Sequence, residues 1–221
     1  KEYPSDKETI LKALMETIEQ ATSGVPVPTD RRITVEDWEE FIILHAHFGS
    51  LTNRALAQLI GQILSERVGY GIVVQHDPYR IFVQTLGAVN SEQLAELLRE
   101  LGMMDEQTVR DSLTRAVVKT GIFKRRMIHV ARRFGALEKW ADFSSVSLQR
   151  LLRSFEGTPI FEEALKEVFL KDLDLERLVY ILRRVREGEI QIVVVKNQGR
   201  ATPIARVGIE RVSMKTDLIP P

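Results

Sequence analysis

The side chains of this sequence best suited to chemistry are four arginines between residues 121 and 137, namely Arg125, Arg126, Arg132 and Arg133. At helical spacing they share one arc with His129, opposite an apolar stripe. The stripe consists of Phe123, Met127, Val130, Ala131 and Phe134. No Asp or Glu occurs in the segment. Because a planar guanidinium donates two hydrogen bonds at once, such a surface suits phosphate. The pattern predicts a basic amphipathic helix that contacts a nucleic-acid backbone; an ordinary solvated helix face is the alternative.

A second candidate anion site lies where a predicted strand passes through Gly49 into a helix. The first turn of that helix carries Ser50, Asn53 and Arg54. Free backbone N–H groups and the positive end of the helix dipole make such a turn a seat for phosphate. Capping of the helix by the Ser50 side chain explains the same residues without a ligand. The charge of Arg54 favours the anion site.

Trp38 is the candidate for stacking against a nucleic-acid base. It lies in the charged segment Asp37-Trp38-Glu39-Glu40, away from any apolar stripe. Stacking contributes roughly 1–3 kcal/mol per base. An equally good interpretation is that Trp38 closes a small hydrophobic core.

Motifs for other kinds of chemistry are missing from the sequence. Neither the phosphate-cradling string G-x-x-x-x-G-K-[ST] nor the dinucleotide-binding G-x-G-x-x-G occurs. The absence of cysteine excludes disulfides and thiolate zinc sites. His45 and His47 stand two residues apart, but without an obvious third ligand two ordinary histidines are favoured over a metal site. We therefore expect no catalytic residue, metal or cofactor in this chain, and no ATPase activity of its own.

Composition limits how the chain can bind nucleic acid. It has 31 Lys and Arg residues against 31 Asp and Glu, so binding must come from a local patch rather than from net charge. With 221 residues and 44% hydrophobic content, the chain can bury a substantial core. Its apolar runs are too short to span a bilayer, and its N-terminus has no signal pattern. We expect no membrane association and a cytoplasmic location.

Hydrophobic periodicity predicts the elements that position these residues. A helix is expected at 6–21, followed by strands at 32–36, 40–47, 71–75 and 80–85 with a helix at 51–68 among them. Beyond residue 90 the pattern predicts helices at 91–101, 105–119, 121–137, 144–153, 160–169 and 175–187, and then a strand at 189–196. This is an α+β fold, in which a small β-β-α-β-β sheet-and-helix unit precedes a mostly helical unit with one late strand.

Changes in composition and period suggest three parts. Residues 1–24 form an N-terminal helix and linker, which leads into the prolines Pro26 and Pro28. Residues 25–89 form the small α/β unit. Residues 90–221 form the helical unit with its C-terminal strand and tail, and Ser91 is the predicted N-cap of its first helix.

Three stretches of the sequence together resemble a known family. They are His45-Ala46-His47-Phe48-Gly49 with Asn53 and Ala55, then Ile122-Phe123 with Arg126 and Ala131, then Thr158-Pro159-Ile160 with Glu163 and the turn at 187–190. In order and spacing they are similar to the DEAD/H-associated domain of the Lhr (large helicase-related) family of superfamily 2 helicases. The resemblance extends from about Pro28 to Pro203.

The resemblance implies a nucleic-acid-binding C-terminal domain of an ATP-dependent 3′-to-5′ DNA, or RNA–DNA hybrid, helicase core that grips the translocating strand. The implied partners are single-stranded or tailed-duplex nucleic acid, and the RecA-like motor and winged-helix domains of the same polypeptide. ATP and Mg²⁺ belong to those motor domains, whose motifs are not in this chain, so no catalytic residue is carried over. The resemblance also implies a part in DNA repair, and the basic helix resembles the archaeal branch of the family.

A second interpretation comes from a different class of function. The chain is then a protein-interaction or regulatory module, whose basic helix docks on a motor domain or on an acidic partner. Salt distinguishes the two, because binding through phosphates weakens steeply as salt rises, whereas docking through an apolar face does not.

Overall fold

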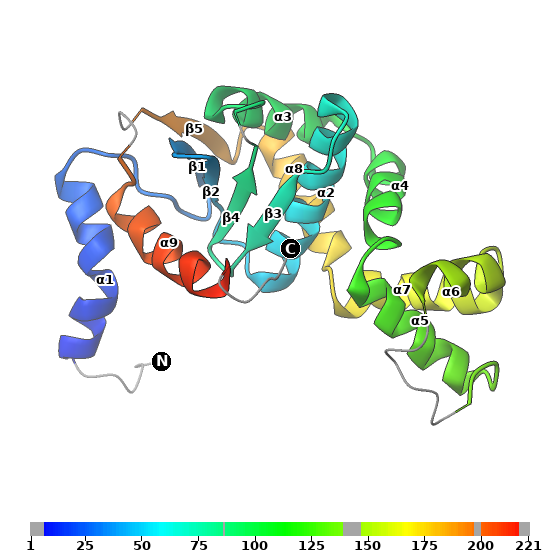
Figure 1. Ribbon diagram of the computed structural model, residues 1–221. Helices are drawn as coiled ribbons and strands as arrows, with labels where there is room; N and C mark the ends of the chain where they lie inside the picture. Colours follow the sequence, from blue (N-terminus) through cyan, green and yellow to red (C-terminus); the bar gives the residue numbers. More distant parts are fainter. Residues whose placement is uncertain (1–6, 86, 139–146, 197–199, 217–221) are drawn as a thin grey trace.

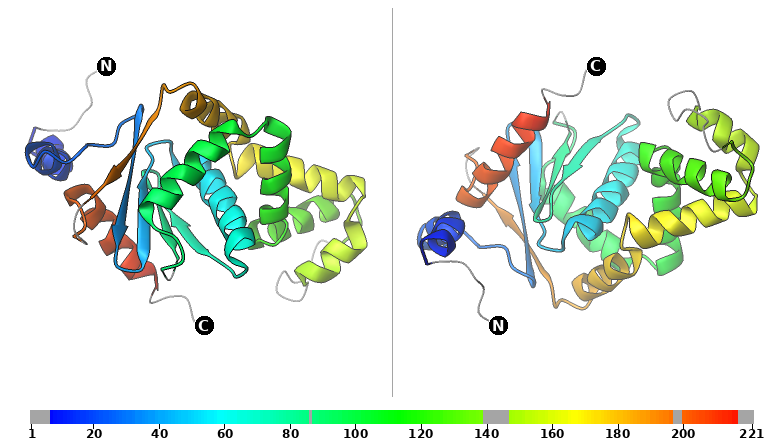
Figure 2. Two further views of the ribbon diagram at one scale, coloured as in Figure 1. Left: turned by 90° about the horizontal axis from the view of Figure 1, so that it is seen from above. Right: turned by 90° about the horizontal axis from the view of Figure 1, so that it is seen from below.

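The computed structural model describes residues 7–85, 87–138, 147–196 and 200–216. A central sheet has helices on both faces (Figures 1 and 2). The helices at 121–133, 148–155 and 159–171 pack together into a lobe that extends from one end. In chain order the elements are α1 (Lys7–Thr22), β1 (Arg32–Trp38), β2 (Phe41–His45), α2 (Ser50–Val68), β3 (Val73–His76), β4 (Arg80–Gln84), α3 (Ser91–Met103), α4 (Glu106–Val117), α5 (Gly121–Arg133), α6 (Leu148–Phe155), α7 (Pro159–Lys171), α8 (Leu175–Arg186), β5 (Gln191–Val195) and α9 (Pro203–Thr216).

The predicted α+β fold is confirmed. The sheet has the strand order β3-β4-β2-β1-β5. The neighbours among β1 to β4 pair antiparallel, and α2 lies between β2 and β3 in the chain. The late strand β5 pairs in parallel with β1 and forms one edge of the sheet. β1 and β2 form a tight hairpin in which Trp38 faces Phe41 across the turn residues Glu39 and Glu40. β5 comes from the predicted third part of the chain, residues 90–221, but it pairs within the sheet of the predicted second part, residues 25–89. The division into three parts stays a prediction.

The two faces of the sheet pack against different helices. Ile33 and Val35 of β1 face the main core, which they share with α2, α3 and α8. On the opposite face, Ile43 and Phe82 pack against Ala205 of α9 in a small second cluster. The alternation along each strand thus places α2, α3 and α8 on one side and α9 on the other (Figure 2).

A buried carboxylate connects the second face to the segment that leads into α9. One oxygen of Glu36 lies 2.7 Å from Nε2 of His45 and accepts the Thr202 hydroxyl hydrogen bond at 2.6 Å. Burial alone raises the pKa of Glu36, but the contacts with His45 and Thr202 outweigh it and leave the pKa below its ordinary value. These contacts attach the start of α9 to the sheet.

One helix cap and one helix start differ from their predicted positions. Asn90, not Ser91, caps α3: its side chain accepts from the backbone N–H of Gln93, whose side chain accepts from the N–H of Asn90. Ser91 instead donates its hydroxyl to Asp37 of β1 at 2.5 Å. The helix predicted at 144–153 begins, within the described residues, at Leu148, and residues 144–146 lie outside the described ranges.

None of the helices in the described ranges has both the length and the apolar character that crossing a bilayer requires.

Candidate nucleic-acid interface

The basic helix forms, but it ends at Arg133 and not at residue 137 as predicted, and it packs its apolar side against α7. The Thr120 hydroxyl caps α5 by accepting from the N–H of Phe123 at 3.3 Å. Phe123 is fully buried and meets the ring of Phe161 in α7 edge to face, with the ring centroids 5.3 Å apart. Phe134 is the exception in the predicted stripe, because it lies at the C-terminal end of the helix and is 55% exposed, whereas Ile128 is buried.

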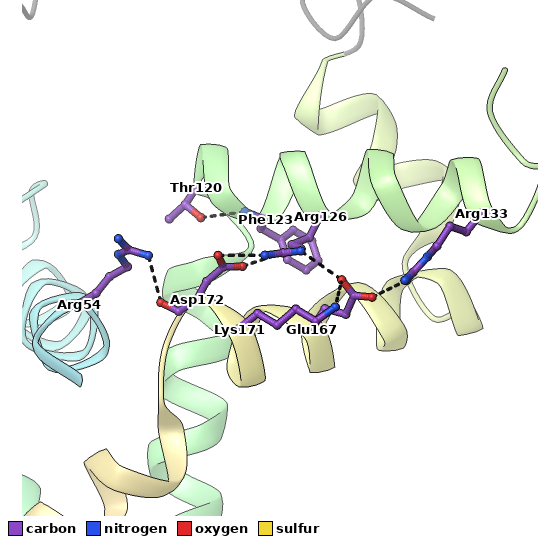
Figure 3. Close-up of polar contacts among 8 residues, drawn as sticks. All are labelled: Arg54, Thr120, Phe123, Arg126, Arg133, Glu167, Lys171 and Asp172. Atoms are coloured by element: carbon purple, nitrogen blue, oxygen red, sulfur yellow. Dashed lines mark hydrogen bonds and ion pairs between the residues drawn. The ribbon is translucent and has the colours of Figure 1, made fainter. Parts of the chain in front are cut away.

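Two of the four arginines meet acidic partners from α7. Arg126 donates to both carboxylate oxygens of Asp172, at 2.7 and 3.2 Å, and to Glu167 at 3.3 Å. Arg133 donates to the other oxygen of Glu167 at 2.5 Å, and Lys171 lies 3.3 Å from the same carboxylate (Figure 3). The segment of the basic helix contains no acid, but α7 and its C-cap residue supply acidic partners for Arg126 and Arg133.

The charges in this network stabilise one another. The side chain of Glu167 is 8% exposed, and burial alone raises its pKa; hydrogen bonds from Arg133 and Lys171 outweigh that effect and lower it. The hydrogen bonds from Arg126 to Asp172 raise the pKa of the guanidinium above its ordinary value. A buried carboxylate with several cationic partners holds α5 against α7.

The other two arginines of α5 differ in exposure. Arg125 is exposed and forms no ion pair with the residues that the structure describes. His129, one turn later, is exposed as well, whereas Arg132 is half-buried. Arg125 is thus the guanidinium of this helix most available to an external phosphate.

Arg54 connects the sheet to the lobe. Its Nη1 donates to the backbone carbonyl of Asp172 at 3.1 Å (Figure 3), and its Nε donates to Nε2 of His76 at 3.3 Å. The carbonyl belongs to the residue that ends α7, where backbone acceptors lack helical partners and the helix dipole favours a cation. Contact of Arg54 with a phosphate stays a prediction, but its observed partners are structural.

The Ser50 side chain does not cap α2, which was the alternative to an anion site at this helix start. Gly49, with φ of 87°, is the N-cap and has no side chain to accept a hydrogen bond, while Ser50 is exposed as the first helical residue. Asn53 is fully buried and its amide donates to the carbonyls of Ala46 and Asp77, at 2.7 and 2.9 Å. The first turn therefore has no side-chain cap, and an anion seat at Ser50 stays a prediction, whereas Asn53 joins two loops of the sheet.

Trp38 lies in the small cluster between the sheet and α9. Its ring stacks on Phe41 with centroids 6.0 Å apart, and it packs with Ile43, Phe82 and Ala205. It is half-buried. This placement favours the core-packing interpretation over stacking against a base.

We expect Trp38→Ala to lower the free energy of unfolding by about 1–2 kcal/mol, because it removes a large half-buried ring from a small cluster. Thermal melting followed by circular dichroism measures this. Strand affinity of the folded variant is expected to equal that of the wild type. An unchanged melting temperature together with weaker binding would instead assign Trp38 to base stacking.

A groove of about 710 Å³ lies between α4, α7 and α8. Phe161, Leu165 and Phe169 give it apolar walls, and Arg110 covers the Phe169 ring at 5.6 Å. No pattern in the sequence predicted this groove, because its walls come from helices that are separate in the chain. A groove with apolar walls and a polar rim is the kind of surface on which a peptide or a domain docks.

Comparison with known proteins adds to this geometry. The profile of the DEAD/H associated family matches residues 27–205. The ATP-dependent helicase Lhr-Core of Saccharolobus solfataricus is 28% identical over 211 residues, which are 88% of this chain and 24% of that protein. Lhr-Core of Sulfolobus acidocaldarius is 24% identical over 202 residues, or 83% of this chain and 22% of that protein. The chain thus spans about a quarter of the length of these relatives.

A solved structure shares the fold. The helicase Lhr of Mycobacterium smegmatis, in a structure with single-stranded DNA and AMP-PNP, superimposes with a TM-score of 0.68 at 22% identity, covering 89% of this chain and 26% of that one. The match of the family profile over most of the chain decides the assignment. The chain belongs to the DEAD/H associated family and is similar to a region of Lhr-type helicases.

Proposed function

We propose that this region grips the nucleic-acid strand along which the helicase moves, with the exposed basic side of α5 against the strand backbone. The observation that carries the proposal is that α5 contains no acidic residue and presents Arg125 to solvent with no ion pair among the described residues. The α7 acids that bind Arg126 and Arg133 hold the helix in place, so the outward guanidinium is presented from a rigid support. Single-stranded DNA in the related mycobacterial structure supports this choice of ligand.

The rest of the helicase completes the proposal. RecA-like motor domains of the same polypeptide, which also carries a winged-helix domain, bind ATP and Mg²⁺ and drive movement with 3′-to-5′ polarity on DNA or on an RNA–DNA hybrid. This region contributes strand contacts and no catalytic group. The protein acts in the cytoplasm, in DNA repair, and belongs to the archaeal type of the family, in accord with the archaeal relatives.

A salt titration tests the proposal. The affinity of the chain for a fluorescent oligothymidine of about 20 nucleotides is measured by anisotropy between about 50 and 200 mM salt. We expect affinity to fall steeply with salt, and Arg125→Gln to reduce the magnitude of the log–log slope by about one, with the melting temperature unchanged. Arg99→Gln is the matched control, because Arg99 is an exposed arginine on α3 that pairs with Glu96. No binding at low salt, or an unchanged slope in Arg125→Gln, contradicts the proposal.

The groove between α4, α7 and α8 favours a second candidate function, the docking of a protein partner or of the motor domain. Four acidic residues line it, Asp111, Glu162, Asp174 and Glu176, against the two basic residues Arg110 and Lys166, so a basic amphipathic segment is the partner that its charge suits. Binding through this groove depends weakly on salt, since apolar contacts supply most of the affinity.

A further inference from the structure

The outward face of α8 combines an exposed aromatic ring with guanidinium groups. Tyr180 is 48% exposed and points away from the buried side of the helix, where Leu178, Ile181 and Leu182 contact the core. The guanidinium carbons of Arg183 and Arg184 lie 5.4 and 5.6 Å from the centroid of the Tyr180 ring. An exposed ring beside cations is the combination on which bases stack in proteins that bind single strands.

Contacts within the protein account for two of the four α8 arginines. Arg184 donates to Glu189 at 2.9 Å, and this hydrogen bond raises the pKa of the guanidinium. Arg186 lies in the last turn, where the helix dipole favours a cation. Both arginines therefore stabilise the C-terminal end of α8.

Arg177 has no such explanation, and Arg183, which also lies in the last turn, has the Tyr180 ring but no acid as a partner. Both are exposed, and neither forms an ion pair with any described residue. Arg177 stands in the first turn of α8, where the positive end of the helix dipole disfavours a cation. Helix stability thus does not account for a guanidinium at this position.

The spacing places these side chains in a single row. Arg177, Tyr180 and Arg183 are three residues apart, so they form a slanted line across the exposed face with the ring in the middle. A rise of about 1.5 Å per residue separates the two arginines by about 9 Å along the helix axis. A base that displaces the Arg183 guanidinium from the face of the ring then has a guanidinium on each side for the phosphates that flank it.

We propose that Arg177, Tyr180 and Arg183 form a second contact for a single nucleic-acid strand, in which a base stacks on Tyr180 and the two guanidiniums bind the flanking phosphates. The proposal rests on the proposed function, since the same strand contacts α5. The two sites are on different elements: α5 lies alongside α7, and α8 continues from α7 away from the lobe (Figure 2). Stacking and phosphate contacts carry no base code, so the site binds strands of any sequence.

Substitutions in the 221-residue chain test the site, with the fluorescent oligothymidine as the probe. Tyr180→Ala is expected to weaken binding about tenfold, because it removes the stacking surface from an exposed helical position. Tyr180→Phe keeps the ring and is expected to retain most of the affinity. Arg177→Gln with Arg183→Gln is expected to reduce the magnitude of the salt slope by about two. Thermal melting shows that each variant is folded.

Photo-crosslinking provides a test that needs no variant. An oligonucleotide that contains iodouracil is irradiated with the wild-type chain, and the crosslinked tryptic peptides are identified by mass spectrometry. We expect a crosslink in residues 178–183, the tryptic peptide that contains Tyr180. Crosslinks only elsewhere, or full affinity in Tyr180→Ala and in the double arginine variant, overturn the α8 site but leave the proposed function standing. Absence of strand binding by the wild type overturns both.

Discussion

Simultaneous replacement of Arg126 and Arg133 by glutamine is expected to lower the free energy of unfolding by about 2–3 kcal/mol, because it removes two of the cations around a buried carboxylate. Glu167 then keeps only Lys171 as an ion-pair partner among the described residues, and Asp172 loses its bidentate contact. Removal of partners from a fully buried ion pair costs about 3–5 kcal/mol, but the Arg126 side chain is 25% exposed, so solvent screening reduces the cost. Urea unfolding followed by circular dichroism measures the change.

Arg125→Gln is the matched control for this prediction. It makes the same substitution on the same helix at an exposed position with no ion pair among the described residues, so stability is expected to stay unchanged. The double variant is therefore expected to act on stability and Arg125→Gln on strand affinity. A double variant as stable as the wild type would show that the α5 to α7 network does not hold the helix in place.

Asn53→Ala is expected to lower the free energy of unfolding by about 2–4 kcal/mol, because the buried carbonyl of Ala46 and the partly buried carbonyl of Asp77 lose their donor and a small cavity forms. The Asn53 amide is the donor for Ala46 and for Asp77, which lie on two loops at the same end of the sheet. The folded fraction is expected to bind the strand with wild-type affinity, since the side chain is fully buried. Unfolding and anisotropy titrations on the same preparation measure both quantities.

Ser50→Ala is the control at the same helix terminus. Ser50 is exposed, and Gly49 takes the N-cap position, so loss of the hydroxyl is expected to leave stability unchanged. If Asn53→Ala is as stable as the wild type but binds the strand more weakly, Asn53 is a ligand-binding residue and not a structural one.

The elements of the fold could be predicted where the signal is local. The α5 segment shows its apolar residues at a spacing of three and four within thirteen residues, so the helix and its buried side were evident. The β1 to β2 hairpin was evident from the charged joint that contains Trp38. The parallel pairing of β5 with β1 was not, because the periodicity of a strand does not identify a partner more than 150 residues away.

The partners of the arginines could not be predicted for the same reason. Glu167 and Asp172 lie 34 to 46 residues beyond the arginines that they bind, and only the packing of α7 on α5 brings them together. Tyr180 was not predicted as a candidate contact, because its segment contains both acids and bases. Only the packing of α8 shows which of its side chains are buried and which face outward. At the start of α2, the preference for serine at helix N-caps indicated Ser50 as the capping residue. The N-cap is instead Gly49, whose positive φ favours glycine.

Arginine footprinting tests most directly the claim that exposed guanidiniums of this chain grip a strand. The chain is treated with phenylglyoxal, which modifies accessible arginines, with and without saturating oligothymidine, and the modified sites are quantified by mass spectrometry. We predict that the strand protects Arg125, and that Arg126 reacts slowly in both samples because Asp172 and Glu167 hold it. Equal modification of Arg125 with and without the strand, under conditions where anisotropy shows the strand to be bound, would contradict the account.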